Sequence, residues 1–296
     1  MDNMLSNDKR IKHGNGWDYL MMIIVTCIII IRHASLPDWL DRGYETFDSF
    51  GNWLIKYSEI CLPLFFAFSG LFFFRGIPAK NQKEWFVERY KKGLTSVIIP
   101  YLIVNILTLA VYFLAQKWAP GMMSGYMGDN WKNPLFIFWK GPINLSLWFV
   151  RELIIMIVAA PLLWMLIRYT WGIFVIIIGI LWGLQIAPQP MFWFCLGSLP
   201  AIFPKPFRAI TEWLDNHPIR IGEEWKQWAW FVYLYHYIPQ IVMKKVGILL
   251  LPSITSGGLI AVWLSNAIIL IASLSLIYLL LRRFTPGILT VLVGGK

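Results

Sequence analysis

The chain has 296 residues, of which 58% are hydrophobic and only 14% are charged, with a net charge of +10. Soluble domains average about 25% charged residues, so this composition excludes an ordinary soluble enzyme and indicates an integral membrane protein. The positive charge does not indicate nucleic-acid binding, because Lys and Arg gather in short segments between apolar spans, as they do in cytoplasmic loops.

Eight apolar segments follow one another along the chain, and each is a predicted transmembrane helix. The predicted fold class is therefore all-α, a polytopic membrane helical bundle of about eight transmembrane helices that forms one domain over residues 1–296. Basic residues before the first segment suit a signal peptide, but an Arg-His pair at its end is a poor approach to a cleavage site, so we expect a retained helix. The eight segments cover residues 17–35, 53–74, 95–115, 145–167, 171–187, 191–204, 228–251 and 258–281.

The distribution of Lys and Arg predicts the orientation. If the N-terminus is cytoplasmic, the cytoplasmic segments hold seventeen Lys and Arg and the opposite loops hold four. Cytoplasmic loops carry the excess of positive charge, so both termini are predicted to be cytoplasmic. The only sizeable outer loop, residues 116–144, could form a lid or a re-entrant segment.

The first span ends in Arg32 and His33, although only Thr26 is polar between Leu20 and Ile31. At about 1.5 Å per residue, His33 would lie roughly 24 Å along the helix from Trp17, just inside the outer interface. Ionisable residues within membrane segments are functional-site candidates. The alternative is that both side chains merely anchor the helix at the interface.

Other ionisable residues fall at a similar depth in three further spans: Lys56 and Glu59, Arg151 and Glu152, and Lys244 and Lys245. Each pair alone could be a structural salt bridge, but together they predict a polar chamber that opens outward. The sequence Tyr-Leu-Tyr-His at 233–236 is expected deeper, nearer the cytoplasmic half. A single buried histidine such as His236 is more often a hydrogen-bonded core residue than a catalyst.

Two further patterns can be explained either by function or by structure alone. Arg89 and Lys92 are three residues apart in a cytoplasmic segment and share one helix face, which could bind phosphates, although from the spacing alone simple positive-inside topology is the preferred explanation. Gly179 and Gly183 could allow close helix packing or be a chance spacing. The three cysteines lie in apolar spans without ligand spacing, so neither a disulfide framework nor a metal site is predicted.

The order of these landmarks resembles the integral membrane acyltransferase 3 family, whose members O-acylate surface glycans and other extracytoplasmic acceptors. The resemblance rests on five motifs spread over most of the chain. They are a first span ending in IIIIRHA, PLFFAFSG at 63–70, RYKKGLTSVIIPY at 89–101, Leu147-Trp148-Phe149 at the start of a span, and YLYH at 233–236, which contains Tyr233 and His236.

The resemblance implies transfer of an acyl group, often acetyl, from cytoplasmic acyl-CoA to a hydroxyl of a surface glycan or lipid-linked sugar. It also implies that His33 is the catalytic base, that Arg89 and Lys92 lie near the phosphates of the donor, and that Ser69 lines the acyl path. Acyl-CoA is then a donor substrate, no cofactor is bound, and no nucleic acid takes part. The expected location is the bacterial inner membrane, with several passes and membrane lipids around the chain.

This chain departs from the family in two respects. The first span of the family usually carries Arg or Lys eleven positions before the histidine, where this chain has Met22. The family also usually has ten spans, whereas eight are predicted here, with one polar segment from Pro204 to Gln227 where two more would be expected.

The implied chemistry is acyl transfer to a hydroxyl, which needs a base and stabilisation of an oxyanion. His33 can remove the proton, and Glu59 or Glu152 can orient it. Oxyanion stabilisation is expected from one of three side chains, Arg32, Arg151 or Trp148.

Two other functions remain open from the sequence. A transporter or proton-coupled carrier would also keep ionisable groups in the membrane, although the chain shows no convincing internal repeat. A catalytically degenerate family member that binds glycan or lipid is suggested by Met22 and the smaller number of spans.

Overall fold

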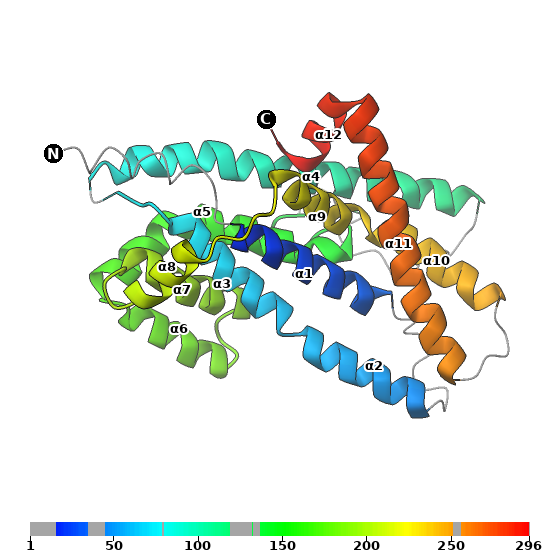
Figure 1. Cartoon of the computed structure of the whole chain (residues 1–296), viewed down its shortest axis with the longest axis horizontal. Helices are drawn as coiled ribbons and strands as arrows, with labels where there is room; N and C mark the ends of the chain where they lie inside the picture. Colours follow the sequence, from blue (N-terminus) through cyan, green and yellow to red (C-terminus); the bar gives the residue numbers. More distant parts are fainter. Residues whose placement is uncertain are drawn as a thin grey trace. The chain divides into compact units, whose positions relative to one another are not determined.

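The structure is a computed structural model that describes residues 16–34, 45–78, 80–118, 132, 137–250 and 256–295. Within these ranges the regular elements are helices (Figure 1), which confirms the all-helical fold class. Most of the outer loop 116–144 lies outside the described residues. The helices are α1 (Trp17–His33), α2 (Glu45–Ser58), α3 (Cys61–Phe74), α4 (Gln82–Trp118), the 3-10 helix η5 (Leu145–Leu147), α5 (Trp148–Tyr169), α6 (Ile173–Gly183), α7 (Gln189–Ile202), α8 (Arg208–Asn216), α9 (Glu223–Tyr235), α10 (Tyr237–Leu250), α11 (Ser256–Phe284) and α12 (Pro286–Val293).

Four helical segments within the described ranges are long and apolar enough to cross a membrane: Thr46–Phe74, Gln82–Trp118, Leu145–Tyr169 and Gly257–Phe284. They contain the second, third, fourth and eighth predicted spans. The helix α6 has only 11 residues, about 16 Å of length, against a hydrocarbon thickness of about 30 Å. The count of eight spans and the cytoplasmic location of both termini stay predictions.

The chain folds into two compact units. The first unit contains Met1–Val25, Leu62–Leu94 and Leu153–Lys226. The second unit contains Thr26–Cys61, Thr95–Glu152 and Gln227–Lys296. Every residue predicted to act in catalysis belongs to the second unit, whereas Ser69, Arg89 and Lys92, the residues predicted to contact the donor, belong to the first.

Two of the predicted continuous spans are interrupted, and a proline explains each interruption. The first break lies between Ser58, where α2 ends, and Cys61, where α3 begins, and Pro63 stands four residues after Glu59, which lies in this break. The second break follows Tyr235, the last residue of α9, and Pro239 stands four residues after it. Proline has no N–H to donate to the carbonyl four residues earlier, and its ring crowds that carbonyl. Each of the predicted spans 53–74 and 228–251 therefore consists of two helices with a short break between them.

In the first unit, two glycines allow α3 and α7 to approach closely. A Cβ atom added at Gly70 would overlap the carbonyl oxygen of Phe194, and one added at Gly197 would overlap the carbonyl oxygen of Ala67. Small residues at a crossing let two backbones approach within a distance that side chains otherwise prevent. The Ser-Gly pair at the end of the PLFFAFSG motif thus has a packing role through Gly70.

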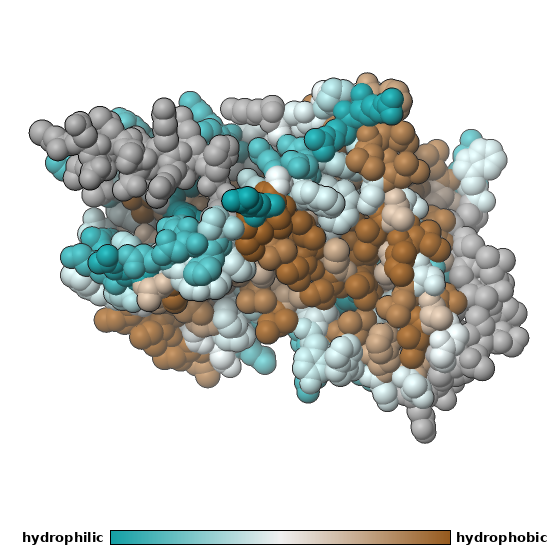
Figure 2. All heavy atoms as spheres, viewed as in Figure 1, coloured by the Kyte–Doolittle hydropathy of each residue, from teal (hydrophilic) through white to brown (hydrophobic). Residues whose placement is uncertain are grey.

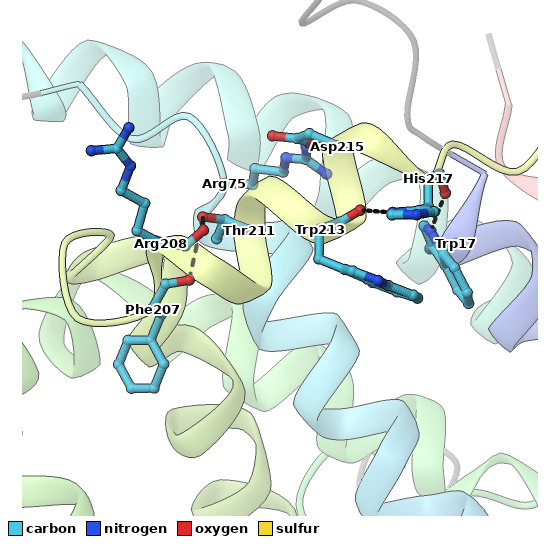
Figure 3. A network of polar contacts seen from close by, with 8 residues as sticks. All are labelled: Trp17, Arg75, Phe207, Arg208, Thr211, Trp213, Asp215 and His217. Carbon is cyan, nitrogen blue, oxygen red and sulfur yellow. Dashed lines mark hydrogen bonds and ion pairs between the residues drawn. The ribbon is translucent and has the colours of Figure 1, made fainter.

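The helix α8 is fastened to the rest of the first unit by the contacts drawn in Figure 3. Arg75, just after α3, forms an ion pair with Asp215. The indole Nε1 of Trp17, the first residue of α1, donates to the carbonyl of His217 at 2.8 Å, and the Trp17 ring lies 5.4 Å from that of Trp213. The polar segment between Pro204 and Gln227 therefore contains an ordered helix with fixed contacts.

In the second unit, α11 holds the end of α1 in place. The buried Trp263 donates its indole N–H to the carbonyl of Ile31 at 2.6 Å. Ile31 lies in the last turn of α1, where carbonyls have no partner within the helix, so Trp263 satisfies one of them. The ring of Phe47, from α2, lies 5.6 Å from Trp263. This packing fixes the helix end that carries His33.

Candidate active site

The strongest candidate site is a group of four aromatic side chains in the second unit, which we call the histidine cluster: His33, Tyr233, His236 and Tyr237. The rings of His33 and His236 are 5.5 Å apart and nearly perpendicular, at 87°. Tyr237 lies 6.4 Å from His33, and Tyr233 lies 5.8 Å from His236. The cluster joins the end of α1 to the interruption between α9 and α10, 203 residues later in the chain.

The contact between the histidines corrects one expectation. His236 was expected deeper in the membrane than His33, on a straight helix. The interruption before Pro239 ends α9 at Tyr235 and begins α10 at Tyr237, so His236 leaves the helical path. Its ring packs edge-on against that of His33. The two histidines therefore lie at one level and form one site.

The protonation pattern of His236 follows from its hydrogen bond. Its Nδ1 lies 2.5 Å from the backbone carbonyl oxygen of Tyr233. A carbonyl oxygen can only accept, so Nδ1 donates, and in the neutral ring Nε2 carries the lone pair. Nε2 is buried and has no hydrogen-bond partner among the described residues, and the same holds for both amide atoms of Gln240, one turn later. Buried polar atoms usually find a partner, so these atoms could accept a hydrogen bond from a polar ligand or donate one to it.

A continuous set of hydrogen bonds fixes the backbone that positions His236. It begins at Asn105 in α4, whose side-chain oxygen accepts from the backbone N–H groups of Ile143 and Asn144 at 2.7 and 3.2 Å. The side chain of Asn144 donates to Thr108 at 3.1 Å. Asn105, Thr108 and Asn144 are fully or almost fully buried, so these bonds are shielded from water.

The same set of bonds continues to α9. The side-chain oxygen of Asn144 accepts from the backbone N–H and the hydroxyl of Ser146, at 3.1 and 2.7 Å, and so caps η5. The carbonyl of Ser146 accepts from the hydroxyl of Tyr233 at 2.8 Å. Tyr233 in turn presents its own carbonyl to His236. We call this path from Asn105 through Asn144, Ser146 and Tyr233 to His236 the supporting network.

The two carboxylates expected to orient His33 contact arginines instead. The Oε1 atom of Glu59 lies 3.9 Å from Nη2 of Arg32, and Glu152 forms an ion pair with Arg151. Within the described part of the chain, no hydrogen bond joins His33 to either carboxylate, and its contacts are the rings of His236 and Tyr237. The location of Glu59 at the interruption after α2 places its charge next to Arg32.

The remaining residues expected in the outer layer differ in their environments. Lys244 is buried, and its charge acts on both His33 and His236. Lys56 is exposed, with its Nζ 6.0 Å from the centre of the Tyr57 ring. Trp148 begins α5 and is 38% exposed. The side chain of Lys245 lies outside the described residues.

The three residues expected at the donor have structural contacts in the first unit. Arg89 donates to the carbonyl of Arg75 at 3.1 Å, and its guanidinium lies 5.2 Å from the centre of the Trp85 ring. Lys92 is exposed and pairs with Glu88 at 2.8 Å. Ser69 is half-buried in α3, directly before Gly70. The carboxylate of Glu88, which pairs with Lys92, also acts on Arg89 through its charge.

The sequence analysis missed Asn105, Asn144 and Gln240. Asn105 and Gln240 lie within apolar segments, where an amide side chain without a partner is costly. Their place within apolar segments could have identified both residues as members of a polar site, since such a side chain must find a hydrogen-bond partner in the fold. Asn144 lies directly before a span and gave only the weak signal of a residue that caps helices. Within the described ranges, no three His, Cys, Asp or Glu side chains gather as metal ligands.

Comparison with known proteins bears on the identity of the chain. The model of the Acyltransferase domain family, acyltransferase 3, matches residues 15–204, which include His33, the PLFFAFSG motif, Arg89 and Arg151. No curated protein and no solved structure matches the chain. The matched region ends before Tyr233 and His236, which complete the histidine cluster. From the match over residues 15–204, we conclude that the chain belongs to the acyltransferase 3 family and is a membrane acyltransferase by family.

Proposed function

We propose that the protein moves an acyl group, often acetyl, from cytoplasmic acyl-CoA to a hydroxyl of an extracytoplasmic carbohydrate, in the bacterial inner membrane. The single observation that carries the proposal is the contact between His33 and His236, whose ring centres are 5.5 Å apart. Two histidines in a buried polar site suit the removal of a proton from a weakly nucleophilic hydroxyl. Membership of the acyltransferase 3 family supports the reaction class.

The proposed step is direct transfer. The acceptor hydroxyl oxygen attacks the carbonyl carbon of the thioester while His33 takes the hydroxyl proton. The carbon–sulfur bond then breaks, and CoA leaves as a thiolate that accepts a proton. His236 keeps its Nδ1 proton on the carbonyl of Tyr233, so the Nε2 lone pair is available for a hydrogen bond from the acceptor or from His33. We therefore assign His33 as the base and His236 as a positioning residue.

Charge stabilisation is proposed to come from Arg32, which is adjacent to the base and only loosely paired with Glu59, at 3.9 Å. Arg151 is a weaker candidate, because its guanidinium already makes an ion pair with Glu152. The developing negative charge on the carbonyl oxygen needs a donor or a positive charge that is already in place.

For the donor, we propose that Arg89 and Lys92 contribute to binding the phosphates of CoA. Arg89 uses one N–H group on the carbonyl of Arg75, and a guanidinium has five N–H donors, so others are available. Lys92 is exposed and held only by Glu88, and exposed ion pairs of this kind are weak.

The proposal is tested with purified protein in proteoliposomes, acetyl-CoA on the side of the basic loops and a soluble polysaccharide on the other. We expect release of CoA together with acetylation of the polysaccharide, detected by mass spectrometry. His33→Ala should lower the rate by about 10²–10⁴-fold, the usual contribution of a general base. Lys140→Gln, in the described part of the outer loop, serves as a matched control and should leave the rate unchanged. Equal rates for the wild type and His33→Ala would refute the assignment of His33.

A binding protein without turnover is the second candidate, and one observation favours it. His33 has no carboxylate partner among the described residues, and Met22 stands where the family usually has a cation. If the assay yields binding of the polysaccharide but no release of CoA, Met22→Arg becomes the informative variant. If Met22→Arg gains acyl-transfer activity, the native chain is a family member that has lost its catalytic activity.

A further inference from the structure

The first unit contains a groove of about 980 Å³, the α6–α7 groove, that no step of the proposed reaction uses. Its volume lies at the upper end of the range of small-molecule sites, about 300–1,000 Å³. The groove lies between the turn that joins α5 to α6, the helix α7, and the segment before α8. Most of its lining is apolar or aromatic, including Trp171, Ile176, Phe192, Leu199, Phe203 and Phe207.

Among the described residues, two cations line the groove, Arg168 at the end of α5 and Lys205 after α7, and no acidic residue lines it. Arg168 lies over the ring of Phe203, 5.5 Å from its centre. Within the described ranges, neither cation forms an ion pair, whereas Arg75 pairs with Asp215 and Arg208 pairs with Glu212 in the same unit. The charge of the groove is therefore open to an anionic ligand.

The apolar lining of the groove continues onto an exposed face of α6. Ile173 and Ile176, which line the groove, are 57% and 64% exposed, and Ile177 and Ile180 follow on the same face at 46% and 59%. Figure 2 shows hydrophobic residues gathered over α6. A row of exposed isoleucines at helical spacing is a liability in water and suits contact with lipid chains.

We propose that the α6–α7 groove binds an anionic phospholipid of the cytoplasmic leaflet. The phosphate lies between Arg168 and Lys205, and one acyl chain lies along the apolar lining toward the isoleucine face of α6. Both cations belong to segments that the charge distribution assigns to the cytoplasmic side, where anionic headgroups attract Lys and Arg. Two cations match one phosphate group, whereas the several phosphates of CoA would leave charge uncompensated. This lipid site shares no residue with the acyl-transfer site and does not depend on the proposed reaction.

Native mass spectrometry of the full chain in detergent tests the proposal, with phosphatidylglycerol and phosphatidylethanolamine as the two probes. We expect phosphatidylglycerol to bind more tightly to the wild type. The double variant Arg168→Gln/Lys205→Gln should weaken its binding about thirtyfold, from the usual contribution of two basic residues near a lipid surface. Arg282→Gln/Arg283→Gln, at the exposed end of α11, is the matched control and should leave binding unchanged.

A second variant tests the apolar part of the groove. Ile176→Trp places a larger side chain at its lining, and we expect weaker binding of phosphatidylglycerol while both cations are retained. A third measurement adds acetyl-CoA or palmitoyl-CoA as a competitor. Displacement of phosphatidylglycerol by either at equal concentration would overturn the lipid assignment and make the groove a donor site. Unchanged binding in Arg168→Gln/Lys205→Gln, or no preference between the two lipids, would overturn it as well.

Discussion

The histidine cluster of the second unit and the α6–α7 groove of the first use charge in opposite ways. In the second unit, Arg151 pairs with Glu152, and His236 is held by the carbonyl of Tyr233. In the first unit, Arg168 and Lys205 line an apolar groove without any carboxylate. Charges in apolar surroundings are costly unless they are paired. The comparison teaches that the charge of Arg151 is already used inside the fold by Glu152, whereas the charges of Arg168 and Lys205 stay available to a ligand.

The largest expected effect comes from breaking a pair. In Arg151→Gln, the carboxylate of Glu152, only 12% exposed, loses its ion-pair partner. Removing one member of a mostly buried ion pair typically costs about 3–5 kcal/mol. We expect a large drop in the midpoint of thermal unfolding in detergent. Lys140→Gln, an exposed cation in the same unit, is the control and should leave the midpoint unchanged.

The double variant Arg151→Gln/Glu152→Gln separates structure from catalysis. It removes both charges, so most of the stability should return. If the folded double variant also regains acyl transfer, Arg151 has a structural role only. If the stability returns but the activity does not, Arg151 contributes to the reaction although it is paired with Glu152.

A smaller loss is expected from the supporting network. Asn144→Ala removes the acceptor for the backbone N–H and the hydroxyl of Ser146, and it leaves Thr108 without its donor. Loss of an N-cap and of buried hydrogen bonds should cost about 2 kcal/mol of unfolding free energy. Asn52→Ala, at an exposed amide in α2, should be neutral. Equal unfolding midpoints for the two variants would contradict a role for the network in stability.

The interruption before His236 can be tested without touching the site itself. Pro239→Ala restores the missing N–H, and we expect α9 and α10 to join into one helix and carry His236 away from His33. Misplacement of a catalytic group by about 1 Å can cost 10²-fold in rate. The rate should therefore fall at least tenfold while stability is kept. Pro161→Ala, in a helix that continues past its proline, is the control. Full activity of Pro239→Ala would show that the position of His236 is unimportant.

The smallest expected effect concerns the donor. Lys92→Gln removes an exposed cation whose partner is Glu88. We expect the KM for acyl-CoA to rise a few-fold at low salt and less at high salt, because exposed charges are screened. Lys91→Gln, at the neighbouring position, is the control. Arg89→Gln should raise KM and also lower stability, since Arg89 supports the carbonyl of Arg75. An unchanged KM in both would leave these residues a purely topological role.

Most of the fold class could be predicted from the sequence, because apolar length and the scarcity of charge are sufficient signals for membrane helices. The gathering of ionisable groups was also predictable in part. Arg32, Glu59, Arg151 and Lys244 all belong to the second unit, and their common depth in the membrane stays a prediction. What could not be predicted was the partner of each group, because pairing depends on how helices rotate about their axes. The contact of Arg32 with Glu59 is an example.

The contact between His33 and His236 was beyond the sequence for a different reason. The sequence predicted His236 deeper in the membrane than His33, whereas in the structure His236 lies between α9 and α10 and its ring packs against that of His33. The sequence shows that Pro239 follows Tyr235 by four residues, but whether a proline breaks a helix depends on the residues packed around it. Pro100 and Pro161 lie inside helices that continue. The two glycines of the predicted packing pair also differ in their surroundings. A Cβ atom added at Gly179 would crowd the ring of Phe192, whereas one added at Gly183 would meet no described residue outside its own helix.

The interruption at His236 also places the beginning of a helix inside the second unit. Tyr237 is the first residue of α10, and its ring lies 6.4 Å from that of His33. The first N–H groups of a helix have no partner within it, and the aligned peptide dipoles give that end about half a unit of positive charge. The helix α9 ends at Tyr235, one residue before His236, so the negative end of its dipole adjoins the positive end of α10 and offsets it. The meeting of two helix ends at His236 therefore lets the chain break its helix there without adding a net backbone charge to an apolar unit.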